Sequence, residues 1–170
     1  MKLSILITLL NEELVLSQTH AAISGQLEQM LGKELTDYEI LYVDDGSSDK
    51  TFELITAIAE ENPHVKYIRF SRNFGRESGI LAGFKYASGD AVMVMDGDLQ
   101  HPPALVPQMI EAYREGYDVV SGRRTRTGES QFRTFLANRF YKLANRLMDT
   151  PLTDGISEFR LFSRKAVRAI

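Results

Sequence analysis

Residues 92–98 read Val92-Met93-Val94-Met95-Asp96-Gly97-Asp98, four apolar residues followed by two acids spaced Asp-x-Asp. The apolar run has the length of a buried strand, and the acids come where the chain would leave the sheet. Oxygen-rich sites of this kind suit Mg²⁺ or Mn²⁺, which keep waters and bind substrate phosphates. The pattern predicts a metal site at a strand end, although Asp and Gly are also favoured in simple solvated turns.

Short apolar runs alternate with segments of helical period along most of the chain. We expect strands at 2–8, 38–43, 65–70, 90–95 and 117–121, and helices at 12–31, 49–60, 76–87 and 103–115. This alternation is typical of an α/β fold in which helices flank a mostly parallel central sheet. Ligands of such sheets bind beyond the carboxyl ends of the strands.

Polar residues follow the first three predicted strands as well. They are Asn11 and Glu12, then Asp44-Asp45-Gly46, then Asn73-Phe74-Gly75. One carboxylate of the adjacent pair could hydrogen-bond a ribose or a base, while Ser48 or Asp49 caps the next helix. The alternative is a capped turn in which every acid binds the backbone. That alternative fits Asp49. It does not fit Asp44 and Asp45 together, because adjacent acids repel each other and only one of them can cap the helix.

The composition indicates one domain and limits its partners. The chain has 170 residues, of which 44% are hydrophobic, and its 20 Lys and Arg against 23 Asp and Glu do not indicate a nucleic-acid partner. The absence of Cys excludes a disulfide framework and a zinc-thiolate site. Residues 121–170 nevertheless hold eleven basic and four acidic residues, so positive charge is concentrated in the last third.

Residues 131–148 combine helical spacing with basic margins. The apolar stripe is Phe132, Phe135, Leu136, Phe140, Leu143 and Leu147, and the basic residues beside it are Arg133, Arg139, Lys142 and Arg146. A helix at a membrane surface has this pattern, and so does a helix packed on the sheet or on a second copy in a homo-oligomer. We therefore divide the domain into a core at 1–130 and an amphipathic, basic segment at 131–170.

Several motifs together resemble family 2 glycosyltransferases. They are Asn11-Glu12-Glu13, Val43-Asp44-Asp45-Gly46-Ser47-Ser48-Asp49-Lys50-Thr51, Ser71-Arg72-Asn73-Phe74-Gly75, Asp96-Gly97-Asp98-Leu99-Gln100-His101-Pro102-Pro103 and Ser121-Gly122-Arg123. The resemblance covers essentially the whole chain. Within the family it is similar to the polyisoprenyl-phosphate branch, which includes dolichol-phosphate mannose synthases and bacterial undecaprenyl-phosphate glucosyltransferases.

The resemblance implies a GT-A fold and an inverting transfer of a sugar from a nucleotide diphosphate, UDP- or GDP-linked, to a polyisoprenyl phosphate. The reaction would occur at the cytoplasmic face of a membrane. Members of the branch usually continue into transmembrane helices, which we expect after Ile170.

The resemblance also implies roles for individual residues. The donor would contact Thr8, Leu10, Glu12, Asp44, Asp45, Gly75 and Asp96; Mg²⁺ or Mn²⁺ would bind Asp96, Asp98 and Gln100; the acceptor phosphate would face Arg123, Arg133 and Arg139; and Asp98, Glu158 and Arg123 would be catalytic. Nucleoside binding is assigned to Asp44 in particular.

Four residues depart from the family pattern. Thr8 and Leu10 replace the Pro and Tyr of the first motif, Glu158 replaces an Asp, and Arg76 stands where Lys is common. The first three leave open a second interpretation, a catalytically impaired domain of the same fold that binds a nucleotide or a membrane partner.

Two further functional interpretations are weaker: an aspartyl-phosphate phosphatase and a metal site built on histidines. Aspartyl-phosphate phosphatases also carry Asp-x-Asp at a strand end, but they place it early in the domain, whereas here it follows the fourth predicted strand. His20, His64 and His101 have no second His or carboxylate at metal-ligand spacing, so we interpret them as surface or packing residues.

Overall fold

The computed structural model describes residues 1–98, 102–123 and 156–170, and the side chains of these residues except 123 and 156–158. The chain divides into two compact units, residues 1–120 with 158–170 and residues 121–157. The site presented below lies in the first unit, and so does the fold apart from residues 121–123 and 156–157. In the part of the chain covered by these ranges, no helix has the length and apolar character needed to cross a membrane.

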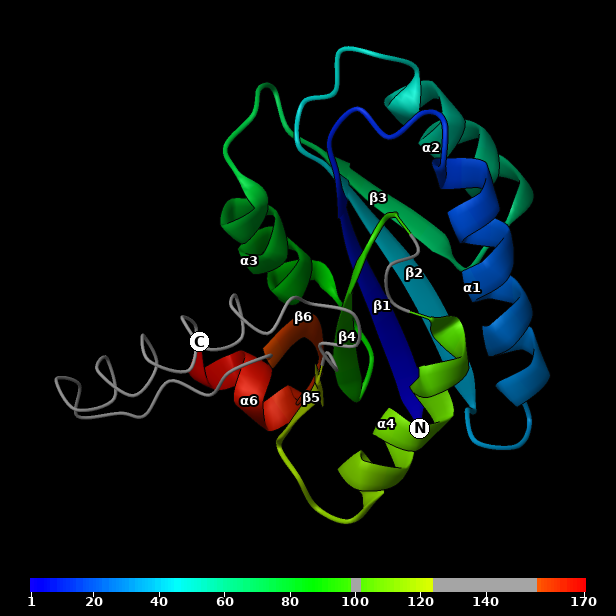
Figure 1. Cartoon of the computed structure of the whole chain (residues 1–170), viewed down its shortest axis with the longest axis vertical. Helices are drawn as coiled ribbons and strands as arrows, with labels where there is room; N and C mark the ends of the chain where they lie inside the picture. The colour runs from blue at the N-terminus through cyan, green and yellow to red at the C-terminus, as the bar shows by residue number, and fades with distance from the viewer. Residues whose placement is uncertain (99–101, 124–155) are drawn as a thin grey trace, which may run out of the picture. The chain divides into compact units, whose positions relative to one another are not determined.

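A six-stranded sheet forms the centre of the fold, in the order β3-β2-β1-β4-β6-β5 (Figure 1). The strands are β1 (Lys2–Leu9), β2 (Asp37–Asp44), β3 (Val65–Arg69), β4 (Ala91–Asp96), β5 (Val119–Arg123) and β6 (Ile156–Ser163). β1 pairs in parallel with β2 and β4, and β2 pairs in parallel with β3, whereas β6 is antiparallel to β4. The carboxyl ends of β1 to β4 therefore meet along one edge.

Helices cover both faces of the sheet. They are α1 (Leu16–Met30), α2 (Thr51–Glu61), α3 (Arg76–Tyr86), the 3₁₀ turn η1 (Pro103–Leu105), α4 (Val106–Arg114) and α6 (Arg164–Ala169). Buried side chains of α1, α2 and α4 share one hydrophobic cluster with the sheet, and those of α3 and α6 share the other. The predicted α/β fold with a mostly parallel sheet is thus confirmed.

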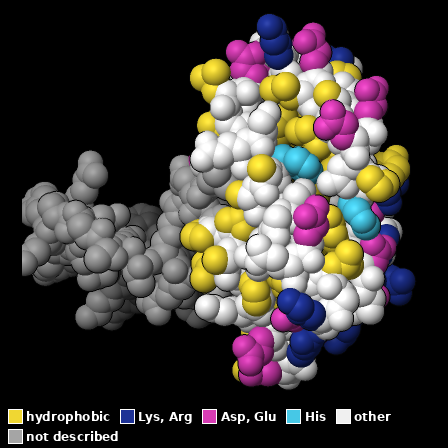
Figure 2. All heavy atoms as spheres, turned by 90° about the vertical axis from the view of Figure 1, so that its right-hand side faces the viewer, with side chains coloured by type: hydrophobic (Ala, Val, Ile, Leu, Met, Phe, Trp, Pro, Cys, Tyr) yellow, Lys and Arg dark blue, Asp and Glu magenta, His cyan; other side chains and the backbone are white. Residues whose placement is uncertain are grey.

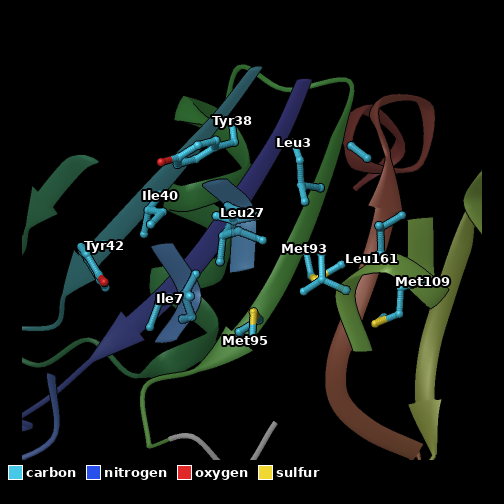
Figure 3. Close-up of a cluster of buried hydrophobic side chains, with 14 of the residues drawn as sticks. Leu3, Ile7, Leu27, Tyr38, Ile40, Tyr42, Met93, Met95, Met109 and Leu161 are labelled. Carbon is cyan, nitrogen blue, oxygen red and sulfur yellow. The ribbon is translucent and has the colours of Figure 1, made fainter. Parts of the chain in front are cut away.

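Strand alternation explains why the sheet has two hydrophobic faces. Ile5 and Ile7 of β1 face α1 and α2, whereas Leu6 between them faces α3. Figure 3 shows residues of the first of these clusters, among them Leu27 of α1, Tyr42 of β2, Ile7 of β1 and Met95 of β4. Strands buried on both faces are characteristic of parallel sheets, because crossover helices lie on each side.

Two glycines let α3 lie close to β1. A Cβ atom on Gly79 would lie 2.7 Å from Cγ2 of Thr8, and one on Gly83 would overlap the side chain of Leu6. Glycine weakens a helix by about 1 kcal/mol relative to Ala, and here it is required by the close packing. The same contact fixes the position of Arg76 at the first turn of α3.

The predicted elements agree with the observed ones except at three places, one of which is the short helix α6, absent from the helices that the sequence analysis predicts. α1 begins at Leu16, four residues later than expected, because the backbone of residues 11–13 is bound to the loop after β2. β6 was not expected as a strand at all, and it inserts between β4 and β5. The predicted helix at 131–148 lies outside the described residues.

Figure 2 shows the molecule from the side of α1 and α2, where acidic and basic side chains are interspersed and do not gather by sign. His20 is hydrogen-bonded through Nδ1 to Oη of Tyr42 at 3.1 Å. His64 stacks on the ring of Tyr38, with a centroid distance of 4.2 Å. These contacts confirm the packing interpretation of both histidines, and His101 lies outside the described residues.

Candidate active site

A cleft of about 290 Å³ opens at the carboxyl ends of β1, β2 and β4, where the loop after β3 also arrives. Its lining residues are Thr8, Leu9, Leu10, Glu12, Asp45, Asn73, Gly75, Arg76, Asp96, Gly97 and Asp98. The cleft thus brings together Asp98 and all the predicted donor-binding residues except Asp44. Leu9, Asn73, Arg76 and Gly97 were not among the predicted site residues.

The loop after β1 is tied to the segment after β2 by hydrogen bonds from backbone amides to side-chain hydroxyls. The amide of Asn11 donates to Oγ of Ser47 at 3.0 Å, and the amide of Glu12 donates to Oγ1 of Thr51 at 2.8 Å. Asn11 has a φ of 56°, in the left-handed region that Asn tolerates better than most residues. This turn directs Glu12 to the cleft.

Asp49 serves the backbone, as the capped-turn alternative expects. Its carboxylate accepts hydrogen bonds from the amide of Thr51 at 3.0 Å and from that of Glu13 at 3.2 Å. The first bond satisfies a free amide at the start of α2, and the second joins the two loops. Asp49 thereby supports the wall of the cleft and does not line it.

Asp44 is not among the residues that line the cleft, and its assigned role in nucleoside binding remains a prediction. It follows Tyr42 by two residues on β2, so its side chain points to the α1 and α2 face and is 0% exposed. Its Oδ1 accepts the amide of Ser47 at 3.1 Å, and its Oδ2 lies 3.4 Å from Nε of Arg69. Among the side chains that the structure describes, this Oδ2 is the one buried nitrogen or oxygen without a hydrogen-bond partner. Asp44 therefore anchors its own loop.

Asp45 lines the cleft and fixes the start of α3. Its carboxylate accepts the amides of Phe74 at 2.7 Å and Gly75 at 2.9 Å, and its side chain is buried. Gly75 has a φ of 89° and Gly46 a φ of 78°. Residues that carry a Cβ atom adopt such backbone angles only at a cost in free energy. A Cβ on Gly46 would also lie 2.6 Å from the carbonyl carbon of Arg72. The two loops are therefore held in one arrangement.

Asp96-Gly97-Asp98 forms the opposite wall. β4 ends at Asp96, and the carbonyl oxygen of Gly97 accepts a hydrogen bond from Oγ1 of Thr19 at 2.7 Å. A Cβ on Gly97 would lie 2.4 Å from Cδ2 of Leu9, so a larger residue there would require the Leu9 side chain to move. The guanidinium of Arg76 forms an ion pair with the Asp96 carboxylate across the cleft.

Negative charge accumulates on this side of the cleft. Partial burial raises the pKa of the Glu12 carboxyl, and the charges of Asp98 and then Asp49 raise it further. Asp98 is exposed and Asp96 is half-buried, so both carboxylates can reach a ligand. A divalent cation would relieve the repulsion between Glu12 and Asp98.

The carboxylates present fit a Mg²⁺ or Mn²⁺ ion. No group of three or more His, Cys, Asp or Glu close enough to hold a metal occurs among the described residues. A Mg²⁺ ion bound by one or two carboxylates, waters and substrate phosphates does not need such a group. Asp96 and Asp98 provide that number of carboxylates at the cleft.

The remaining predicted site residues lie where their side chains are not described. Gln100, Arg133 and Arg139 fall outside the described residues, and so do the side chains of Arg123 and Glu158, which belong to β5 and β6. Their assigned roles in metal binding, acceptor binding and catalysis remain predictions.

Comparison with known proteins identifies the family. The family model described as "Glycosyl transferase family 2" matches residues 4–170. An uncharacterized glycosyltransferase of Bacillus subtilis, YkcC, is 41% identical over 95% of this chain and 49% of its own length. A "Prophage bactoprenol glucosyl transferase homolog" of Escherichia coli is 34% identical over 100% of this chain and 55% of its own. The chain thus spans about half the length of these curated relatives.

A solved structure agrees with the fold. A mannosyltransferase from Pyrobaculum calidifontis, solved in complex with GDP-Man and Mn²⁺, matches 98% of this chain and 46% of its own, with a TM-score of 0.66 at 18% identity. At that identity the likeness concerns the fold alone, which is the GT-A type. From the family match over nearly its whole length, we conclude that the chain belongs to glycosyl transferase family 2.

Proposed function

We propose that the cleft binds a nucleotide-diphosphate sugar, UDP- or GDP-linked, and that the protein transfers the sugar with inversion to a polyisoprenyl phosphate. One observation carries the proposal: the acids Glu12, Asp96 and Asp98 meet the guanidinium of Arg76 in one cleft beyond the strand ends. The bactoprenol glucosyl transferase homolog supports a polyprenyl acceptor. Complexes of fold relatives with nucleotide sugars support the donor class.

The cleft can stabilise the charge that develops in such a transfer. When the sugar leaves, the nucleotide diphosphate gains negative charge, and Arg76 would bind phosphate oxygens with two parallel N–H donors. Asp96 and Asp98 would hold a divalent cation, which would supply further neutralisation of the leaving diphosphate. The acceptor phosphate is ionised near neutral pH, so it requires orientation by cations more than a strong base. Arg123, Arg133 and Arg139 remain the proposed cations, and Glu158 the proposed acid near the acceptor.

We propose that the reaction takes place at a membrane, because a polyisoprenyl phosphate resides in one, and at its cytoplasmic face, as the family resemblance implies. The basic residues of 121–170 would add affinity for an anionic surface, each by about 1 kcal/mol.

A thermal-shift panel tests the proposed function. UDP-, GDP- and dTDP-sugars are each added with and without Mn²⁺, and a ligand that binds the folded state raises the melting temperature. We expect at least one donor to raise it only when Mn²⁺ is present. No shift with any donor would overturn the donor site. Binding without turnover of a polyisoprenyl phosphate would favour the catalytically impaired alternative.

The nucleoside contact distinguishes the two adjacent acids. We propose that Asp45, which lines the cleft, and not the buried Asp44, contacts the nucleoside. Asp45→Ala should weaken uridine or guanosine binding about tenfold, because a contact and the anchor of the α3 start are lost together. Asp44→Ala should lower the melting temperature and leave the nucleoside affinity of the folded protein close to wild type. Calorimetry with the free nucleoside measures both variants, and the reverse ranking would return the role to Asp44.

A further inference from the structure

The cleft holds more carboxylates than cations before any ligand enters. Four acids line it, Glu12, Asp45, Asp96 and Asp98, whereas Arg76 is the one basic lining residue in the described part of the chain. The Asp45 carboxylate is bound by the amides of Phe74 and Gly75. Arg76 is paired with Asp96, one of the two acids at which a divalent cation would bind. The same carboxylate thus faces two alternative counter-ions.

The backbone of Arg76 is fixed while its side chain can reorient. Asp45 holds the two residues before α3, and Gly79 brings the first turn of α3 against Thr8 of β1. The Arg76 side chain is about one-third exposed, so its guanidinium has room to leave Asp96 without moving the helix. A guanidinium also binds phosphate in the same two-pronged geometry as it binds a carboxylate.

We propose that Arg76 is an exchangeable counter-ion, which pairs with Asp96 in the empty cleft and turns to the donor diphosphate when a divalent cation occupies Asp96. The inference rests on the proposed donor site. The exchange would keep the cleft close to electrical balance in both states. It would also favour ordered loading, because the guanidinium that binds the nucleotide is released by the cation that the nucleotide needs.

The exchange predicts effects of opposite sign on two ligands. Without nucleotide, Arg76 competes with the metal for Asp96, so Arg76→Gln should tighten Mn²⁺ binding by up to about fivefold, the range of a partly exposed ion pair. With Mn²⁺ present, the same variant loses a charged hydrogen bond to phosphate and should bind UDP or GDP at least about tenfold more weakly. An Arg that only supports the fold would weaken both ligands together.

Calorimetry with Mn²⁺ alone, and then with UDP and GDP at saturating Mn²⁺, measures both effects on the same protein. Arg72→Gln is the matched control, because it removes the same charge from the preceding loop, where Arg72 stacks over the ring of Phe74 at 4.8 Å and does not line the cleft. We expect the control to stay within about twofold of wild type for both ligands. Arg76→Lys, which keeps the charge without the planar donor pair, should fall between wild type and Arg76→Gln for both ligands.

The binding constants of the two variants either support the exchange or overturn it. Tighter Mn²⁺ binding with weaker nucleotide binding in Arg76→Gln alone supports the exchange. Changes of the same sign for both ligands, no change, or an equal change in Arg72→Gln would overturn it while leaving the donor site intact. Wild-type protein that binds neither UDP nor GDP with Mn²⁺ would overturn the donor site itself and the exchange with it.

Discussion

Asp98→Ala is expected to abolish the Mn²⁺-dependent binding of every nucleotide-diphosphate donor while the protein remains folded. Asp98 is an exposed acid at the cleft, with Asp96 as the second described carboxylate in the proposed cation site. Loss of a residue that only supports a metal ligand costs about 10- to 100-fold in metal affinity. Loss of one of two carboxylate ligands should therefore cost more than about 100-fold.

The fold should tolerate this substitution, because Asp98 repels a neighbour. Its charge is the second cause, after burial, of the raised pKa of Glu12. Removing it relieves that repulsion, so the melting temperature without metal should stay unchanged or rise slightly. A variant that melts earlier and binds no donor would indicate a structural role instead.

Asp90→Ala provides a matched control for Asp98→Ala. Asp90 is an exposed acid at the opposite end of β4, where its carboxylate accepts the amide of Lys2 at 2.7 Å. Its substitution removes the same charge far from the strand-end cleft, so donor binding should match wild type. The measurement is calorimetry of UDP- and GDP-sugars with Mn²⁺ and with EDTA. Mn²⁺-dependent binding that survives in Asp98→Ala would exclude Asp98 as a ligand.

The strand-end residues could be predicted from local pattern, and their final orientation could not. The runs before Glu12 and Asp96 have strand length, and the rule that parallel strands gather ligands at their carboxyl ends places both acids in one cleft. Which of Asp44 and Asp45 lines the cleft depends on the direction in which each side chain points at the end of β2. The partners of Asp45 are the amides of Phe74 and Gly75, about 30 residues away, and no local signal identifies them.

β6 shows a second limit of sequence reasoning. Phe159 and Leu161 alternate as buried residues, which is a strand pattern, but such a short alternation is not enough to predict a strand on its own. Its insertion beside β4, more than 60 residues earlier in the chain, is a tertiary choice that propensity does not encode. Arg76 is similar: its charge was noted, but only the packing of α3 on β1 places it opposite Asp96.

A buried carboxylate outside the cleft should contribute strongly to stability. Glu39 of β2 is 2% exposed and faces the α3 side of the sheet. It accepts hydrogen bonds from Nζ of Lys66 at 2.7 Å, Oγ of Ser4 at 2.6 Å, and both the amide and the hydroxyl of Ser88. These bonds connect β1, β2, β3 and the turn between α3 and β4.

The environment of Glu39 makes its contribution dependent on pH. Burial raises the pKa of the Glu39 carboxyl, but the bonds from Lys66, Ser4 and Ser88 outweigh burial and lower it to about 2. Because the folded pKa lies below the unfolded value, the contribution is complete above about pH 4.5 and is lost as pH falls toward 2. A shift of this size corresponds to about 3 kcal/mol. Glu39→Gln should lower the free energy of unfolding by roughly that amount at pH 7.

Urea unfolding of wild type and Glu39→Gln at steps from pH 7 to the lowest pH with a cooperative transition measures this linkage. The difference between the two proteins should be constant down to about pH 5 and should fall to less than half by about pH 3. Glu60→Gln is the control, because the side chain of Glu60 is exposed on α2 and its loss should change stability by no more than about 0.5 kcal/mol. A stability difference for Glu39→Gln that stays the same between pH 7 and pH 3 would mean that the side chain acts through its shape and neutral hydrogen bonds. The charge of Glu39 would then not be what holds the turn after α3 to the sheet.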